Sequence, residues 1–493
     1  MTQPADTAPA PHPMIRFYRP DLSGNERRYE RRCCWDPFRV GQVTKPATHR
    51  DTAPPVKAPR GRTPRSAGEV MKGARQSSSR GDPADPHHGM GWISTPWHVT
   101  CQLGPRTAPE SCSAGRNRQD GVMLLLIPGP VTTRPEVRAA LAQDFAPWDN
   151  DFRPLYLGVR TRLLRIAGGH PATHVTLVLQ GCGHFVTEAA VRSFLPPGGK
   201  ILIPDTGAYA DRMFRLATEA GRQVIQLPIP QTVPIDPQAV ASALAADPSI
   251  SHVGQVYSET GSGVIHDVAA VGAVVRAAGR RLIVDGVSAF GALPFDLAGQ
   301  PEVDAILFTS NKCFEGVPGL AFAIARIDRL LASTGNAGSW SFDLADIYAH
   351  SLRTGGGSFR FTPPAQVLNA FNTALDLYDA EGGQPARLAR YVANMRVLYD
   401  GAIGLGLVPC LSRDTQGPVV VNIHAPPDPA WNLQAFVDAL KTRGVLISNF
   451  CNTPSPSFRV GCIGAISPTD MAYAVASMGE ALHELGIQPR EAA

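Results

Sequence analysis

The sequence predicts an α/β protein in which a large domain, built on a mostly parallel sheet of seven strands covered by helices, precedes a small C-terminal α+β domain. From Leu124 onward, short apolar runs alternate with stretches of helical periodicity, which is typical of strands connected by helices. The runs are apolar at successive positions, as expected of strands covered on both faces. After the glycines at 355–357 and the prolines at 363–364, the order changes to long helices followed by short strands.

The large domain, residues 123–375, contains the seven expected strands. They cover residues 175–179, 200–203, 223–227, 252–257, 281–284, 305–308 and 320–324. Helical patterns lie between them, among them residues 186–194, 209–220, 237–246 and 268–278, and Gly279 follows the last of these as a C-cap. Because strands and helices alternate, neighbouring strands are expected to be parallel.

The small domain, residues 376–493, begins with helices rather than strands. A helical stretch at 365–380 leads into it, and a second covers residues 385–405. The expected strands are residues 419–423, 445–448 and 458–460, with helices at 433–443 and from residue 468 onward.

Residues 1–120 differ from the rest in composition. They carry 19 Lys and Arg against 11 Asp and Glu, they are rich in Pro, Ser and Gly, and they show no periodic apolar face. Such a segment buries too little apolar surface to offset its ordering entropy. We therefore expect a disordered extension, or translated sequence upstream of a true start at Met123, with no role in the chemistry.

Charge and cysteine usage exclude several classes of function. The residues after 120 carry 27 basic against 31 acidic side chains, so they give no electrostatic reason to expect nucleic acid or an anionic membrane as a partner. The nine cysteines form no CxxC pair, so no metal site is expected. The chain has no apolar run of signal or membrane-spanning length, and a cytoplasmic location is expected.

Lys312 and Asp285 are the main candidate catalytic pair. Asp285 ends one apolar run, and Lys312 comes 27 residues later, just after another. A pyridoxal phosphate enzyme needs a lysine to form a Schiff base and a carboxylate to keep the pyridine nitrogen protonated. Taken alone, Lys312 would read as a surface lysine and Asp285 as a turn or capping residue.

A glycine-rich turn follows the first expected strand of the sheet. Its residues Cys182, Gly183 and His184 open a helical pattern, and backbone N–H groups at the start of a helix favour a phosphate. A metal site made of the Cys-x-His pair is the weaker interpretation. Gly181, Glu259, Asp285 and Lys312 all fall at carboxyl ends of expected strands, where open α/β sheets bind their ligands.

Three further residues are candidates for contacts within such a site. Tyr209 could stack on the cofactor ring, or it could be an ordinary core tyrosine. Arg459 could hold a substrate carboxylate with its planar guanidinium group, or it could be a surface arginine at a strand end. Thr260 could place a hydroxyl group near the phenolic oxygen of the cofactor.

Over residues 123–487 the chain resembles the class V aminotransferases of the fold-type I pyridoxal phosphate group. The resemblance is carried by these segments: Leu-Leu-Leu-Ile-Pro-Gly-Pro at 124–130, Trp-Asp-Asn-Asp at 148–151, Ser-Glu-Thr at 258–260, Val-Asp at 284–285, Ser-Asn-Lys-Cys at 310–313, Gly-Val-Pro-Gly at 316–319, Arg-Phe-Thr at 360–362 and Phe-Arg-Val-Gly at 458–461.

The resemblance implies a role for each candidate residue. Lys312 would be the Schiff-base lysine, Asp285 the pyridinium partner and Arg459 the substrate clamp. The other cofactor-binding residues would be Cys182, Gly183, His184, Tyr209, Thr260, Val287 and Asn311, with Thr362 contributed by a second subunit. The family also implies a homodimer with its sites at the subunit interface.

The Asn-Lys-Cys and Gly-Val-Pro-Gly segments are similar to those of the phosphonate branch of the class. They imply transamination of 2-aminoethylphosphonate with pyruvate, giving phosphonoacetaldehyde and alanine in phosphonate catabolism. The Gly-x-Gly-His form of the turn is instead that of alanine– or serine–glyoxylate and –pyruvate members, which stay an alternative. A dimer that binds pyridoxal phosphate in a regulatory role, without turnover, is the alternative from another class of function. A lyase or desulfurase ranks below these, because Cys313 is adjacent to the lysine and poorly placed for a mobile nucleophile.

Overall fold

The computed structural model describes residues 123–450, 453 and 455–487. The expectation of a disordered or spurious extension at residues 1–120 lies outside these residues. Among the helices that are described, none is long and apolar enough to cross a membrane.

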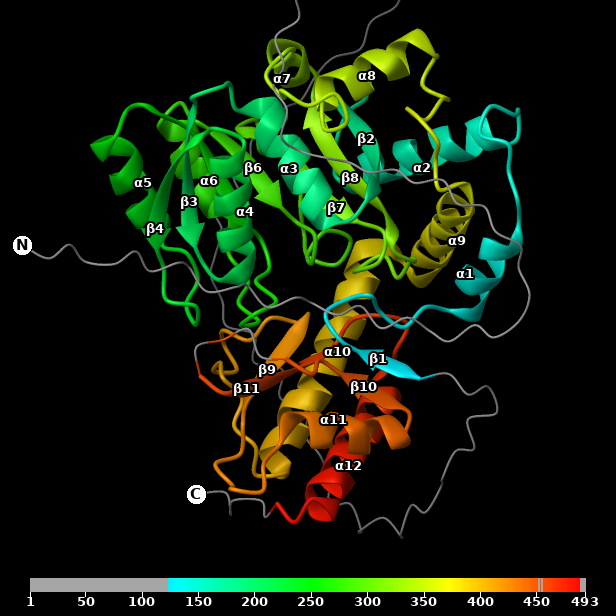
Figure 1. Ribbon diagram of the computed structural model, residues 1–493, viewed down its shortest axis with the longest axis vertical. Helices are drawn as coiled ribbons and strands as arrows, with labels where there is room; N and C mark the ends of the chain where they lie inside the picture. The colour runs from blue at the N-terminus through cyan, green and yellow to red at the C-terminus, as the bar shows by residue number, and fades with distance from the viewer. Residues whose placement is uncertain (1–122, 451–452, 454, 488–493) are drawn as a thin grey trace, which may run out of the picture. The chain divides into compact units, whose positions relative to one another are not determined.

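A mixed sheet of seven strands forms the centre of the larger part of the fold (Figure 1). Its order is β2-β8-β7-β6-β5-β3-β4. The strands are β2 His174–Gly181, β3 Lys200–Asp205, β4 Gln223–Pro228, β5 Ile250–Val256, β6 Arg281–Asp285, β7 Val303–Thr309 and β8 Gly319–Arg326. β8 pairs antiparallel with both β2 and β7, and the other pairs are parallel, so the predicted mostly parallel seven-stranded sheet is confirmed.

Helices connect and cover these strands. They are α1 Pro135–Ala139, α2 Phe152–Ile166, α3 Gly183–Phe194, α4 Ala208–Glu219, α5 Pro237–Ala246, α6 Val268–Ala277, α7 Ile327–Ala332, α8 Leu344–Arg353 and α9 Ala365–Glu381, with a short 3-10 turn at Ala140–Ala142. The ranges predicted from the sequence did not include α1, α2, α7 or α8. In α2, Pro154 and Gly158 hide the helical pattern, although a proline in the first turn of a helix is tolerated.

The C-terminal part has two small sheets and a hydrophobic core of its own. β9 Val420–His424 pairs antiparallel with β11 Ser457–Gly461, and β10 Val445–Ile447 pairs parallel with β1 Leu124–Leu126. The helices are α10 Gly383–Gly404, α11 Leu433–Thr442 and α12 Pro468–Glu484. Leu124 and Leu126 therefore belong to the same core as Phe436 and Phe458, although they come first in the described chain. The predicted boundary near residue 375 stays a prediction.

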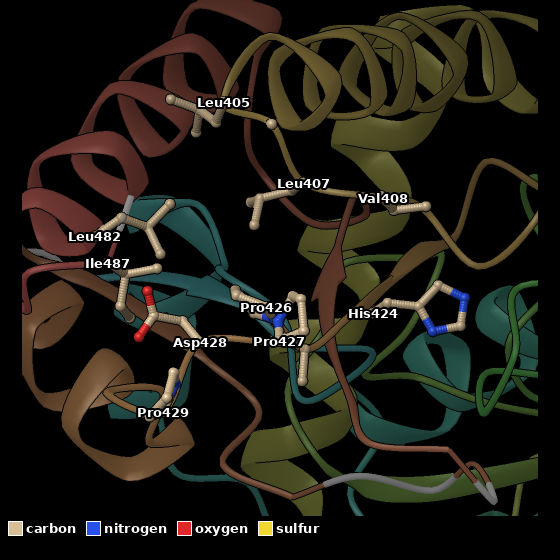
Figure 2. Close-up of a pocket in the computed structure, with 12 residues that line it drawn as sticks. Leu405, Leu407, Val408, His424, Pro426, Pro427, Asp428, Pro429, Leu482 and Ile487 are labelled. Atoms are coloured by element: carbon tan, nitrogen blue, oxygen red, sulfur yellow. The ribbon is translucent and has the colours of Figure 1, made fainter. Parts of the chain in front are cut away.

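A cavity of about 490 Å³ lies within this C-terminal part. Leu407, Pro426 and Leu482 are among the side chains around it (Figure 2). None of the residues predicted to form the active site lines it.

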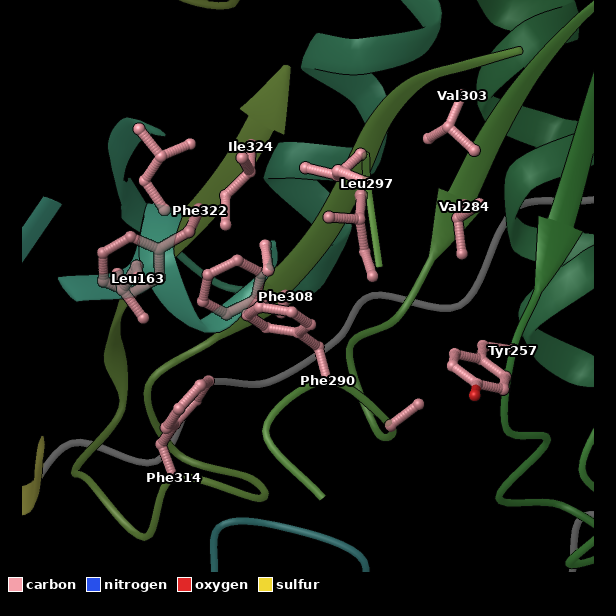
Figure 3. Close-up of a cluster of buried hydrophobic side chains, with 14 of the residues drawn as sticks. Leu163, Tyr257, Val284, Phe290, Leu297, Val303, Phe308, Phe314, Phe322 and Ile324 are labelled. Carbon is pink, nitrogen blue, oxygen red and sulfur yellow. The ribbon is translucent and has the colours of Figure 1, made fainter. Parts of the chain in front are cut away.

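Side chains that alternate along each strand separate the core of the large sheet into two layers. Val284 packs in the cluster that includes α2, α6 and α9, whereas its neighbour Ile283 packs in the cluster that includes α3 and α4. On the first side, Phe308 stacks on Phe322 with ring centroids 5.1 Å apart, and Phe290 lies 4.4 Å from Phe308 (Figure 3). Burial on both faces explains why these strands read as continuous apolar runs in the sequence.

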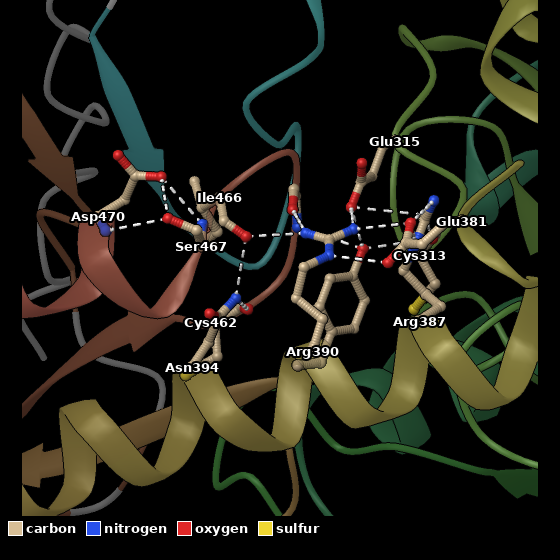
Figure 4. A network of polar contacts seen from close by, with 12 residues as sticks. Cys313, Glu315, Glu381, Arg387, Arg390, Asn394, Cys462, Ile466, Ser467 and Asp470 are labelled. Atoms are coloured by element: carbon tan, nitrogen blue, oxygen red, sulfur yellow. Dashed lines mark hydrogen bonds and ion pairs between the residues drawn. The ribbon is translucent and has the colours of Figure 1, made fainter. Parts of the chain in front are cut away.

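A buried network of ion pairs fastens the segment after β7 to α10 (Figure 4). Glu315 Oε1 accepts hydrogen bonds from Arg390 Nη2 at 2.6 Å and from the Tyr391 hydroxyl at 2.7 Å. Arg387 Nη1 donates to the carbonyl of Cys313 at 2.5 Å. Glu315 has a φ of 59°, which L-residues rarely adopt, so these bonds hold a strained backbone close to Lys312.

We expect the Glu315→Ala substitution to destabilise the protein strongly, because it removes one of the two carboxylates, Glu315 and Glu381, that the buried Arg387 and the half-buried Arg390 share. Removing one partner of a buried charge pair lowers the free energy of unfolding by about 3–5 kcal/mol. The measurement is urea unfolding followed by circular dichroism. Glu219→Ala is the matched control, since Glu219 forms an exposed pair with Arg215 and its loss should leave the midpoint close to that of the parent. Equal midpoints for the two variants would contradict the structural role given to Glu315.

Candidate active site

The carboxyl ends of neighbouring strands bring the predicted site residues to one edge of the sheet. Asp285 is the last residue of β6, and Asn311 and Lys312 follow the end of β7 at Thr309. Tyr209 lies in the first turn of α4, after β3. β3 and β5 are neighbours in the sheet, but β3 is followed by β4 on one side and β5 is followed by β6 on the other. Open α/β sheets bind ligands at the carboxyl ends of the strands where the strand order reverses in this way.

A cavity of about 160 Å³ at this edge contains most of the predicted cofactor site. Its wall is formed by Cys182, Gly183, His184, Thr187, Tyr209, Arg212, Asp285, Val287, Thr309, Asn311 and Lys312. Residues from four separate strand ends thus face one space.

Lys312 reaches the cavity from the turn after β7. Its Nζ donates a hydrogen bond to the carbonyl of Pro128 at 2.8 Å. Burial lowers the pKa of Lys312 to about 8, and the positive charges of Arg459 and Arg212 act in the same direction. A larger fraction of this amine than of an exposed lysine is therefore neutral, and so nucleophilic, near neutral pH.

Asp285 lies on the wall of the same cavity. Its Oδ1 accepts a hydrogen bond from the backbone N–H of Val287 at 3.0 Å. Burial raises the pKa of Asp285 to about 6, while the Val287 N–H, Arg212 and Lys312 all favour the ionised form. The carboxylate is thus ionised at neutral pH, as a partner for a pyridinium nitrogen must be.

The start of α3 offers backbone donors to an anion. Cys182 precedes the helix in an extended conformation, and no side chain caps the first turn. A Cβ at Gly183 would lie 2.9 Å from the Val287 side chain, so only glycine lets the helix start this close to the segment after Asp285. Uncapped N–H groups and the helix dipole together make a suitable phosphate site.

A second cavity of about 400 Å³ adjoins the first, because Lys312 and Tyr209 line both. Arg459, which is only 3% exposed, lies on its wall. The Arg459 Nη1 donates to the carbonyl of Thr260 at 3.0 Å, and the guanidinium group lies 4.6 Å from the centroid of the Phe450 ring. A cation is therefore held in a fixed orientation beside the reactive amine.

Arg212 and Thr309 are wall residues that were not predicted from the sequence. Arg212 lies three residues after Tyr209 on α4, with its guanidinium carbon 5.0 Å from the centre of the tyrosine ring. Helical spacing from Tyr209 was the signal that could have indicated it. The Thr309 hydroxyl is buried and has no hydrogen-bond partner among the described residues.

Two predicted cofactor residues line neither cavity. Thr260 is fully buried, and its carbonyl holds Arg459. Thr362 lines a separate cavity of about 230 Å³ together with Phe185 and Phe342. Their predicted contacts with the cofactor stay predictions. Within the part of the chain that the structure describes, no cluster of three or more His, Cys, Asp or Glu side chains could hold a metal ion.

Comparison with known proteins places this arrangement in a family. The class V aminotransferase family model matches residues 159–409 of the chain. The 2-aminoethylphosphonate–pyruvate transaminase 1 of Burkholderia lata is 44% identical over 369 residues, which cover 75% of this chain and 99% of that protein. The chain belongs to the class V aminotransferases.

A second relative and a solved structure match about the same share of the chain. The 2-aminoethylphosphonate–pyruvate transaminase 1 of Cupriavidus pinatubonensis is 41% identical over 364 residues, covering 74% of this chain and 95% of that protein. Pyridoxamine–pyruvate aminotransferase from Mesorhizobium loti superposes with a TM-score of 0.68 at 26% identity, over 75% of this chain and 94% of that structure. The enzyme is thus a pyridoxal phosphate-dependent aminotransferase of fold-type I.

The cavity around Lys312 fits pyridoxal phosphate in its donors and charges. Its wall carries an amine that suits the aldehyde, a carboxylate that suits the pyridine nitrogen, and the uncapped start of a helix that suits the phosphate. The unpartnered hydroxyl of Thr309 is a further polar group that a bound ligand would satisfy.

Gly129→Ala should weaken cofactor binding, because a Cβ at Gly129 would lie 2.4 Å from Cδ and 2.7 Å from Nζ of Lys312. Gly129 also has a φ of 137°, which disfavours any side chain. We expect the affinity of the cofactor-depleted protein for pyridoxal phosphate to fall by about tenfold or more, a loss of roughly 1.4 kcal/mol. The check is an absorbance titration.

Gly404→Ala serves as the control for this substitution, since no atom lies within 4 Å of the added Cβ at the end of α10. Parent-like affinity in the Gly129 variant would show that Lys312 does not depend on the space beside Gly129.

Proposed function

We propose that the enzyme transfers the amino group of 2-aminoethylphosphonate to pyruvate, giving phosphonoacetaldehyde and alanine. The observation that carries this assignment is the 44% identity, along 99% of its length, to a relative that bears this activity in its name. Relatives of the same name match at 40–44% identity over about three quarters of this chain.

Lys312 has two tasks in this reaction. It would hold the aldehyde carbon of the cofactor until the amino donor takes its place. The freed ε-amine then moves a proton from the amino-bearing carbon of the donor, and its lowered pKa of about 8 suits both taking and returning that proton. When bound, pyridoxal phosphate supplies an electron sink for the pair of electrons left on that carbon.

Asp285 and Tyr209 orient the cofactor ring from different directions. The ionised Asp285 carboxylate would keep the ring nitrogen protonated, which the electron sink requires. Tyr209 would stack on the ring face, with Arg212 beyond it. Cys182, Gly183, His184 and Asn311 would surround the phosphate, and Val287 would pack beside the ring.

Arg459 gives the second cavity its selectivity for acids. Its buried guanidinium group would bind the pyruvate carboxylate through two parallel hydrogen bonds. Lys441 and Asp438 also line this cavity, so a further cation and one carboxylate lie on its wall. Phe450 covers one face of the guanidinium group and keeps its orientation fixed.

Alanine or serine as amino donor, with glyoxylate or pyruvate as acceptor, is the second candidate activity. The Gly-Cys-Gly-His turn at residues 181–184 favours it, because that form of the turn resembles the alanine–glyoxylate and serine–pyruvate members. A regulatory dimer without turnover is less well supported, since Lys312, Asp285 and Arg459 are all present and directed at adjoining cavities.

The half-reaction distinguishes these activities. Purified holoenzyme mixed with 2-aminoethylphosphonate alone, without a keto acid, should lose the visible absorbance band of the lysine-bound cofactor. Alanine should bleach the same band, because it is the product of the second half-reaction and acts as the amino donor when that half-reaction runs in reverse. Lys312→Ala should show neither the band nor its bleaching. Bleaching by serine but not by the phosphonate would contradict the proposed donor.

The proposal includes a homodimer in the cytoplasm with its sites at the subunit interface. Support comes from an exposed aromatic pair, Trp340 (71% exposed) and Phe361 (54% exposed), whose ring centroids lie 5.1 Å apart. Large exposed apolar patches are typical of contact surfaces. Thr362 follows Phe361 and lines no part of its own chain's cofactor cavity, as expected of a residue that serves the neighbouring subunit.

Phe361→Asp should shift the dimer toward monomers, because a carboxylate at a dry interface has no partner to offset its desolvation. Light scattering after gel filtration at micromolar concentration should give half of the parent mass, and cofactor affinity should fall in parallel. Val408→Asp is the control, since Val408 is equally exposed at 54% but lies in the C-terminal part. A variant that keeps the parent mass would exclude this surface as the interface.

A further inference from the structure

Glu259 is a buried carboxyl group at the active site that takes no part in the reaction proposed for Lys312, Asp285 and Arg459. It lies just after β5, in a turn closed by the bond from its own N–H to the Val264 carbonyl at 3.0 Å. The side chain is 1% exposed. A carboxyl group is almost never fully buried unless it is paired, so its environment calls for an explanation.

The two oxygens of Glu259 have different surroundings. Oε1 accepts a hydrogen bond from the backbone N–H of Gly261 at 3.0 Å. Oε2 is buried and has no hydrogen-bond partner among the described residues. It lies against Gly207, where a Cβ would come within 3.3 Å of it. An ionised oxygen in this position would be dry and would lack a well-formed hydrogen bond, which costs more than a neutral one.

The same carboxyl group lies at the start of α4. Gly207 is the N-cap residue of that helix, has a φ of 139° and offers no capping side chain. Tyr209 belongs to the first turn, and its backbone N–H favours the ionised form of Glu259. Glu259 thus packs where a cap would be, between the turn after β5 and the residue proposed to stack on the cofactor ring.

The turn that carries Glu259 also contacts the other two parts of the site. The Tyr257 N–H donates to the Asp285 carbonyl at 2.9 Å, and the Thr260 carbonyl accepts from Arg459. Glu259 therefore lies among the ring-stacking tyrosine, the pyridinium carboxylate and the substrate guanidinium group.

The charged groups around Glu259 oppose one another. Burial, together with the negative charge of Asp285 on β6, raises the pKa of Glu259 to about 8. The N–H groups of Gly261 and Tyr209 and the positive charge of Arg459 on β11 act in the opposite direction. A second carboxylate beside Asp285 would make it harder for Asp285 itself to stay ionised.

We propose that Glu259 is a positioning residue that works as a protonated carboxylic acid, fastening the start of α4 and Tyr209 to the turn that holds Arg459 without adding a second negative charge beside Asp285. The effect on turnover rests on the function proposed above. The state of the proton does not, because it follows from the surroundings of the carboxyl group in the chain itself.

Thermal unfolding of the cofactor-depleted full chain tests whether the Glu259 carboxyl group is protonated in the folded protein. A carboxyl group whose pKa is higher in the folded than in the unfolded state stabilises the fold fully below its unfolded pKa, near 4.5, and this contribution is lost as the pH rises through about 8. Glu259→Gln, which keeps the shape but cannot ionise, should therefore match the melting temperature of the parent at pH 5. At pH 9 it should exceed that of the parent by about 4 °C or more.

Glu136→Gln, at an exposed glutamate in α1, is the matched control and should follow the parent at both pH values. The same pH dependence in the parent and in Glu259→Gln would overturn the proposal. An unfolded Glu259→Gln protein beside a folded Glu259→Asp protein would overturn it as well, because a neutral isostere would then have failed where an ionisable acid succeeds.

The second measurement addresses positioning. Glu259→Ala should lose about tenfold or more in pyridoxal phosphate affinity and in the rate of the half-reaction, and Glu259→Gln should recover most of both losses. Recovery by Asp but not by Gln would show that a charged group is needed and would contradict the neutral form. If the parent does not react with 2-aminoethylphosphonate, the substrate assignment fails, whereas the melting and affinity measurements still decide the role of Glu259.

Discussion

Removal of water from one amine and one carboxyl group is the constraint on which the rest of this enzyme depends. Lys312 and Asp285 lie on the wall of one small cavity, and burial brings their pKa values toward each other, to about 8 and about 6. Dry ionisable groups are useful only when the backbone that carries them is fixed. The parallel strands β6 and β7 fix one side, and the ion pairs of Glu315 with α10 fix the segment that follows Lys312.

Arg390 on α10, which binds Glu315, also contacts the segment that follows β11. Arg390 donates to the carbonyls of Gly464 and Ile466, just beyond the strand that carries Arg459. Contacts with α10 therefore hold both the segment after Lys312 and the segment after Arg459 in place. Because α10 contacts the segments on both sides, the two adjoining cavities keep a fixed position relative to each other. Such positioning matters because turnover requires the donor carbon to lie within reach of the lysine.

The sequence predicted the sheet well because each central strand is apolar on both faces, as the buried runs at β6 and β7 illustrate. It predicted Gly181, Asp285 and Lys312 at one edge because carboxyl ends of parallel strands meet there. It could not indicate Arg390 or the isolation of the Glu259 carboxyl group, because Arg390 binds carbonyls more than 70 residues away and Glu259 Oε2 lies against Gly207. Helix α2 was missed because a proline and a glycine obscure its periodicity.

The pairing of β1 with β10 joins two segments about 320 residues apart. During synthesis on the ribosome, at about 5–20 residues per second, Leu124–Leu126 would wait roughly 15 to 60 seconds before their partner strand emerges. Throughout that interval an apolar strand has an open edge, which is a hazard for aggregation. The β1–β10 pair can therefore form only after translation has passed residue 447.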